Sequence, residues 1–173
     1  MESTVKSKVG VNGRVKGADA EREFIRLLQP VVNKVQYREG LGSVEPYLTG
    51  PILHRNLDQT RVGGHDICGL DWLAIEVKRC ETLEIDKWWE QTLRQAEEAD
   101  GATPVLAYRQ SRKPWNVVMW VSPMHHWFDE ELGLVRGTIG LGDFLLWLEC
   151  QLKGKLLSES LTKPMGAKMC GLM

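Results

Sequence analysis

Residues 73–78 constrain the fold most, because apolar and polar side chains alternate there as they do along a half-buried β-strand. Successive side chains of a strand point to opposite faces of its sheet. Glu76 and Lys78 therefore share one face with Ala74, and the other face anchors the strand in the core. That apolar face consists of Leu73, Ile75 and Val77.

Asp66 is a second acidic residue that this strand can bring into play. A turn is predicted at residues 69–71, so antiparallel pairing would place the Asp66 carboxylate beside that of Glu76. Two adjacent carboxylates repel each other unless a cation lies between them. The pattern therefore predicts a metal site of the kind that cleaves phosphodiesters. An exposed ion-pair cluster, in which Lys78 bridges the two carboxylates, is the structural alternative.

A helix is predicted from Gly17 onward, because apolar residues return at intervals of three to four positions. Pro30 is expected to end or kink this helix, since its ring clashes with the preceding turn. Glu21 lies at the edge of the apolar stripe, where only Arg22 and Arg26 of the same helix could pair with it. A buried carboxylate without a partner is costly, which favours a functional role for Glu21. The stripe is formed by Phe24, Leu27, Leu28 and Val31.

The rest of the chain predicts an α/β fold. Apolar runs of strand length alternate with amphipathic helical patterns, and a strand, a helix and a returning strand form an α/β unit. The predicted elements are a helix over 85–99, strands over 104–108 and 115–120, and a last helix over 142–152.

A chain of 173 residues with 43% hydrophobic content can bury one substantial core, so we predict a single domain with extensions. The stretch 37–64 is rich in glycine and proline and predicts an irregular insertion, with a weak strand signal at 52–57. The predicted organisation is a flexible basic arm (1–15), one domain (16–153) and a mobile C-terminal tail (154–173).

Charge is segregated along the chain, although the formal net charge is only −1. Residues 1–38 contain eight Lys or Arg and four acids, whereas residues 81–100 contain seven acids and two bases. A nearly neutral molecule can therefore still present a basic surface to a polyanion, and two ordinary solvated faces are the alternative. The four cysteines lack C-x-x-C spacing, and no membrane-length apolar run is present, so we expect free thiols, no membrane partner and a cytoplasmic location.

Two separate segments, residues 16–28 and 74–78, resemble the archaeal-type Holliday junction resolvases of the PD-(D/E)XK nuclease superfamily. The resemblance continues through Asp66, 104–107 and the strand around Trp120, and it covers most of residues 16–122. Residues 55–61 resemble the corresponding insertion of resolvase-like nucleases from bacterial viruses, so the chain is similar to a bacteriophage-encoded member. The resemblance implies a restriction-endonuclease-like core with a central mixed five-stranded sheet flanked by helices.

The resemblance also implies a catalytic set of Glu21, Asp66, Glu76 and Lys78. Asp66 and Glu76 are expected to bind Mg²⁺, for which Mn²⁺ can substitute, together with the Val77 carbonyl and Glu21, because hard cations prefer oxygen ligands. Lys78 would orient the nucleophile or stabilise charge in the transition state. Gln95 is a possible further site residue, with a solvated helix position as the alternative.

The expected partner is branched DNA, which a homodimer would bind in the cytoplasm, or in the host cytoplasm if the chain is viral. The expected reaction nicks opposing strands of a four-way junction. The alternatives are a nuclease of the same fold that cuts flaps, forks or duplex, and a DNA-binding protein without catalysis. Basic residues are expected to contact phosphates, which positions DNA without reading its sequence. The candidates for DNA contacts are Arg14, Lys16, Arg22, Arg55, Arg61 and His65.

Overall fold

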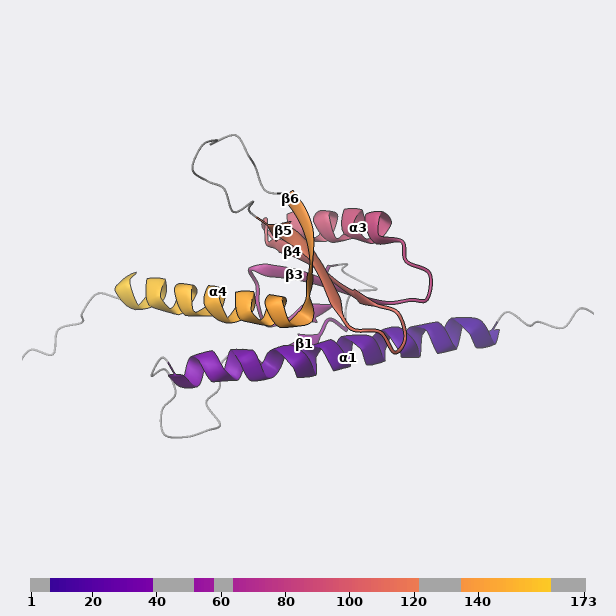
Figure 1. The fold of residues 1–173 in the computed structure, drawn as a ribbon, viewed down its shortest axis with the longest axis horizontal. Helices are drawn as coiled ribbons and strands as arrows, with labels where there is room; N and C mark the ends of the chain where they lie inside the picture. The colour runs from indigo at the N-terminus through magenta and orange to yellow at the C-terminus, as the bar shows by residue number, and fades with distance from the viewer. Residues whose placement is uncertain (1–6, 39–51, 58–63, 122–134, 163–173) are drawn as a thin grey trace, which may run out of the picture.

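The computed structural model describes residues 7–38, 52–57, 64–121 and 135–162, and within them three helices enclose one sheet (Figure 1). This α/β architecture confirms the predicted fold class. In chain order the elements are α1 (Ser7–Arg38), β1 (His54–Arg55), β2 (Ile67–Cys68), β3 (Leu73–Arg79), α3 (Ile85–Glu98), β4 (Thr103–Arg109), β5 (Asn116–Val121), β6 (Val135–Gly140) and α4 (Leu141–Thr162).

The sheet is mixed and its strands follow the order β1-β2-β3-β4-β5-β6. β3 and β4 are parallel and are connected through α3, whereas the other neighbours are antiparallel. Five strands were predicted, and the described residues contain six. The difference lies at the sheet edges, where β1 has only two residues and β6 is mostly exposed, so neither carries a strong alternating signal.

Helices cover both faces of the sheet (Figure 1). On one face α1 and α4 pack over the predicted apolar face of β3, and Phe24 stacks against Phe144 with ring centroids 6.2 Å apart. On the other face α3 places Trp88 and Trp89 against Leu106 of β4. Burying each such large side chain contributes about 1.5–3 kcal/mol. The buried residues therefore fix β3 between two apolar layers.

Two helices are longer than predicted. α1 begins at Ser7 rather than Gly17, and it continues through Pro30 to Arg38. Of the two effects predicted for Pro30, an end of the helix is wrong, and a kink stays a prediction. Pro30 lies on the exposed side of α1, where water can bond the carbonyl that lacks its helical donor. α4 extends to Thr162, beyond the predicted end at residue 152. The division into an arm, one domain and a tail stays a prediction.

None of the helices in the described ranges combines the length and the apolar content that crossing a membrane requires.

Candidate active site

The pairing of β2 with β3 places Asp66 beside the part of β3 that contains Glu76. β2 and β3 pair antiparallel through Ile67 and Ile75, and the Asp66 amide donates a hydrogen bond of 2.9 Å to the Ile75 carbonyl. Residues 66 and 76 are the next residues beyond this pair, at the same end of it. The predicted antiparallel arrangement of these two acidic residues is therefore confirmed.

Gly69 makes the turn that sets this register. Its φ of +109° lies in the left-handed region, which side chains with a Cβ rarely adopt. A Cβ at this position would also lie 3.0 Å from the Ile52 carbonyl oxygen and 3.3 Å from the Leu53 Cα. Only glycine therefore lets the turn pass so close to the chain that leads into β1.

The site lies at an edge of β3 that β2 leaves unpaired, because β2 has only two residues. Beyond Ile75, the Val77 amide donates instead to the Asp66 carboxylate, with 2.7 Å between N and Oδ2. In an extended strand the N–H and C=O of one residue point to the same edge. The Val77 carbonyl therefore points to the edge where Asp66 lies, as a metal ligand at that position requires.

Glu76 is the most buried acidic residue of the site, with 1% of its surface exposed. Its Oε1 accepts a hydrogen bond of 2.8 Å from Gln91 Nε2 and also pairs with the Lys78 ammonium. Its Oε2 is buried and has no hydrogen-bond partner among the described residues. A buried carboxylate oxygen without a donor is unfavourable, so this atom is poised to bind a cation. The burial of Glu76 also excludes the alternative of an exposed ion-pair cluster.

Glu21 faces the same site from α1, and its partner comes from β1 rather than from its own helix. The Arg55 guanidinium pairs with the Glu21 carboxylate, whose side chain is 13% exposed. Burial raises the pKa of Glu21 above its ordinary value, the hydrogen bond from Arg55 opposes this rise, and the negative charge of Asp66 adds to it. Glu21 and Asp66 line the same cavity.

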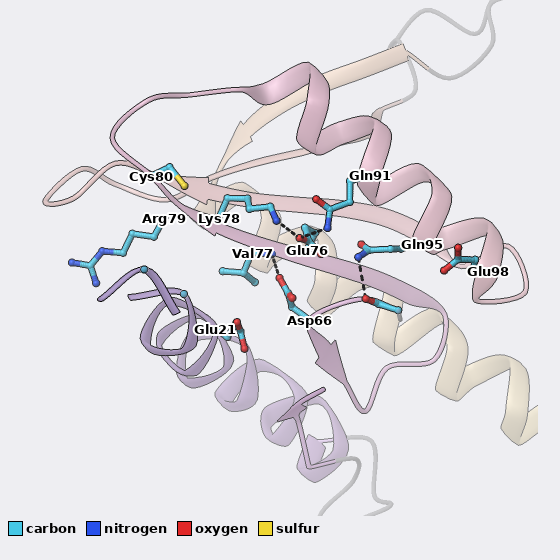
Figure 2. A pocket seen from close by; sticks show the side chains of 13 residues that line it. Glu21, Asp66, Glu76, Val77, Lys78, Arg79, Cys80, Gln91, Gln95 and Glu98 are labelled. Atoms are coloured by element: carbon cyan, nitrogen blue, oxygen red, sulfur yellow. Dashed lines mark hydrogen bonds and ion pairs between the residues drawn. The ribbon is translucent and has the colours of Figure 1, made fainter. Parts of the chain in front are cut away.

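These residues line one open cavity of about 590 Å³ between α1, β3 and α3, which we call the active-site cavity (Figure 2). The structure thus brings the whole predicted catalytic set and Val77 together, although their catalytic roles stay a prediction. The remaining residues that line the cavity are Gly13, Gly17, Gly64, Arg79, Cys80, Gln91, Gln95 and Glu98.

The donor set fits a hard divalent cation. Glu76 offers an unpartnered oxygen, the Val77 N–H orients the Asp66 carboxylate, and the Val77 carbonyl points to the same edge. No group of three or more His, Cys, Asp or Glu in the described part of the chain is already gathered as a metal cluster. Glu21 is held by Arg55, which agrees with a site built on two carboxylates and a carbonyl.

Three of the six predicted DNA contacts, Lys16, Arg22 and Arg55, are engaged in ion pairs. Lys16 Nζ lies 2.7 Å from Glu81 Oε1, and Arg22 Nη1 lies 2.8 Å from Asp19 Oδ1. His65 is partly buried, and this burial lowers its pKa below the usual value, so its ring carries little positive charge near neutral pH. The Arg14 side chain and Arg61 lie outside the described residues.

Three polar residues of α3, Gln91, Gln95 and Glu98, line the active-site cavity. Gln95, which was predicted as a possible site residue, is 8% exposed, and its Nε2 donates a hydrogen bond of 3.0 Å to the Gly64 carbonyl oxygen. The alternative of a solvated helix position is therefore wrong. Gln91 was not predicted, although its place one turn before Gln95 is a signal that could have identified it. Arg79 was missed because alternation along β3 assigns it to the opposite face from Lys78.

Comparisons with known proteins found one family and one solved structure that are similar to this chain. A family model described as "Phage putative PDDEXK endonuclease" matches residues 12–142. No curated protein matches the chain. The chain is similar to a solved structure of Hjc from Archaeoglobus fulgidus, described as a Holliday junction resolvase from an archaeal hyperthermophile. The two share 19% identity with a TM-score of 0.37, and the match covers 78% of this chain and 96% of that chain.

Proposed function

This chain belongs to the family of phage PDDEXK endonucleases, and from that premise we propose that it is a metal-dependent endonuclease that cuts DNA in the active-site cavity. We further propose that it selects branched DNA, with the four-way junction as its main substrate, and that it acts as a homodimer in the cytoplasm of the host cell. Mg²⁺ is the proposed cofactor, and Mn²⁺ is expected to substitute for it.

One observation carries the proposal of catalysis. Glu76 Oε2 is buried without a hydrogen-bond partner among the described residues, and Glu76 lines the same cavity as Asp66 and Val77. A non-catalytic DNA-binding protein has no need to bury such an atom at the bottom of an open cavity. The arrangement instead supports a site that gains a divalent cation.

Each residue of the proposed set has a separate task. Asp66, Glu76 and the Val77 carbonyl would hold the cation, which supplies a bound water of lowered pKa and neutralises charge on the scissile phosphate. The Val77 N–H keeps Asp66 oriented, and Gln91 keeps Glu76 oriented. The Lys78 ammonium adds positive charge beside the reacting phosphate. Glu21 would reach the cation directly or through water.

The preference for branched DNA is a separate part of the proposal, more specific than DNA cleavage itself. It rests on residues 16–28 and 74–78, which separately resemble the archaeal-type resolvases. A four-way junction has two-fold symmetry, so a two-fold dimer can present one cavity to each of two opposing strands. A same-fold nuclease for flaps, forks or linear duplex is the second candidate, and the open shape of the cavity is compatible with it.

A cleavage panel tests the proposal. Purified protein with Mg²⁺ should nick a synthetic four-way junction on opposing strands and should cut flap, single-stranded and linear duplex DNA more slowly at equal concentration. Asp66→Asn and Glu76→Gln should abolish cutting but retain DNA binding. Glu97→Gln, at an exposed position of α3, is the matched carboxyl-to-amide control and should cut normally.

The outcomes separate the candidate functions. Equal cutting of junction and duplex would remove junction selectivity and leave the nuclease. Normal cutting by Asp66→Asn or Glu76→Gln would remove the proposed metal ligands. Calorimetry that detects neither Mg²⁺ nor Mn²⁺ binding, together with an absence of cutting, would favour the non-catalytic DNA-binding protein.

A further inference from the structure

Gly13 and Gly17 are two helix-interior residues that packing and backbone geometry leave unexplained. Glycine destabilises a helix interior relative to alanine, because it loses the most conformational freedom on folding. Neither glycine has a positive φ. A Cβ at Gly13 would meet no atom within 4 Å among the described residues, and a Cβ at Gly17 would meet only Glu21 Oε1 at 4.0 Å. Alanine would therefore fit at both positions.

Both glycines lie on the face of α1 that borders the active-site cavity. They are one helical turn apart, and Glu21 follows a further turn along, so all three share that face. At two consecutive turns the helix thus presents bare backbone to the cavity. A bare backbone is the usual means by which a helix or loop allows close approach of a ligand.

Arg79 borders the same cavity from the end of β3. Its Nε is buried and has no hydrogen-bond partner among the described residues. In Figure 2 its side chain extends away from the Asp66 and Glu76 carboxylates, so it does not compete with a cation held between them. A guanidinium in this setting is suited to a phosphate, which it can bind through two parallel N–H donors.

An independent observation also points to a ligand in this cavity. Gln95 is more than nine-tenths buried, and its Oε1 has no hydrogen-bond partner among the described residues, although its Nε2 is bonded to the Gly64 carbonyl. A buried amide oxygen normally finds a donor. The lining of the cavity therefore contains a buried hydrogen-bond acceptor that neither the glycines nor Arg79 explains.

We propose that Gly13, Gly17 and Arg79 form a seat for the DNA backbone, in which Arg79 binds a phosphate adjacent to the one that is cut and the bare face of α1 gives the strand room. We call these three residues the phosphate seat. The inference rests on the proposed function, because it assumes that the polyanion in the cavity is a nucleic-acid strand. In this proposal the role of Gly13 and Gly17 is to let the DNA strand approach α1, and not to stabilise the fold.

The first test uses stability and DNA binding as opposed readouts. Gly13→Leu should keep or raise Tm, since leucine favours the helix, and should weaken binding because its side chain fills the seat. Gly154→Leu is the matched control, at an α4 glycine whose Cβ would also meet no atom within 4 Å among the described residues. It should keep or raise Tm without changing affinity. Affinity is measured by fluorescence anisotropy of a labelled duplex oligonucleotide in EDTA, so that no metal is needed.

The second test removes the positive charge of Arg79. Arg79→Gln should weaken binding by roughly tenfold and reduce the slope of log affinity against log salt by about 1, as expected for the loss of one phosphate contact. Lys153→Gln on α4 is the charge control and should leave the slope unchanged. A merely structural role for Arg79 would lower Tm without moving the salt slope.

The results of these tests distinguish a failure of the phosphate-seat proposal from a failure of the proposed nuclease activity. If Gly13→Leu and Arg79→Gln both bind like the wild type, the seat is overturned, even if the wild type cuts DNA with Mg²⁺. If both variants bind weakly at unchanged Tm, the seat is supported, even if no cutting is found and the proposed catalysis fails. A wild-type protein that binds neither the duplex nor a four-way junction in EDTA overturns the seat.

Discussion

Gln91 donates a hydrogen bond of 2.8 Å from its Nε2 to the Oε1 of Glu76, across the space between α3 and β3. This contact leaves the other Glu76 oxygen without a partner among the described residues. An amide from a neighbouring helix thus fixes the orientation of a carboxylate that would bind a cation. Residues in such a supporting position commonly set the affinity of a metal site.

Replacing Gln91 should therefore weaken metal binding more than it weakens folding. Gln91→Met keeps the volume but removes the donor, and we expect the affinity for Mn²⁺ to fall at least about tenfold. Calorimetric titration with Mn²⁺ measures this change. Gln151→Met, at an exposed position of α4, is the control and should bind Mn²⁺ like the wild type. Equal affinities for the Gln91 variant and the wild type would refute a supporting role.

The pair formed by Arg55 and Glu21 should contribute measurable coupling to stability. Both side chains are mostly buried, so water screens their attraction less than it screens a surface pair. A double-mutant cycle with Arg55→Gln and Glu21→Gln should give about 1 kcal/mol of coupling in urea unfolding. The exposed Lys87–Glu84 pair, 3.2 Å apart, should give less than about 0.5 kcal/mol. Equal coupling in the two cycles would count against a structural role for Arg55.

The sequence predicted the parts of the site that depend on local periodicity. Glu76 and Lys78 follow from the alternation along one strand, and Asp66 follows from a turn and an antiparallel register. The partner of Glu21 could not be predicted, because Arg55 comes from a two-residue strand in a segment that reads as irregular. Gln91 was missed because a polar residue at the edge of an amphipathic helix looks solvated until β3 is placed against it.

The start of α1 is another feature that the sequence did not predict. Residues 7–16 contain two glycines, and a sequence of low helix propensity predicts a loop. In the structure this segment continues the regular turns of α1, with Gly13 bordering the active-site cavity. The edge strand β1 lies within the weak strand signal at residues 52–57, whereas the edge strand β6 was missed because most of its residues are exposed and give no clear apolar alternation.

Acid should weaken the contact between α1 and α4. Glu149 of α4 lies 2.6 Å from Lys34 of α1 and 2.9 Å from Lys153, and these two ammonium groups, Lys34 first, lower the pKa of Glu149 from 4.5 to about 2. A lowered folded-state pKa adds stability above the unfolded value of 4.5, and this stability is lost as the pH falls toward 2. Thermal melts should therefore show a lower Tm for Glu149→Gln than for the wild type at pH 7.

That difference in Tm should shrink as the pH falls below 4.5 and should vanish only as the pH passes below about 2, where the wild-type Glu149 is mostly protonated as well. Glu97→Gln, on the exposed face of α3, is the control for a general effect of removing one acid. A constant Tm difference for Glu149→Gln from pH 7 to pH 2 would show that the ion pairs do not stabilise the α1–α4 contact.

Alanine should have opposite effects at two glycines, because one is required by the backbone and the other is not. Gly69→Ala forces a Cβ into a φ of +109° and to 3.0 Å from the Ile52 carbonyl oxygen, so we expect a loss of about 1–3 kcal/mol. Gly154→Ala in α4 meets no atom within 4 Å among the described residues and should gain about 0.5–1 kcal/mol. Urea unfolding measures both. A neutral Gly69→Ala would mean that the turn relaxes freely, and the register that joins Asp66 to Glu76 would then depend on other contacts.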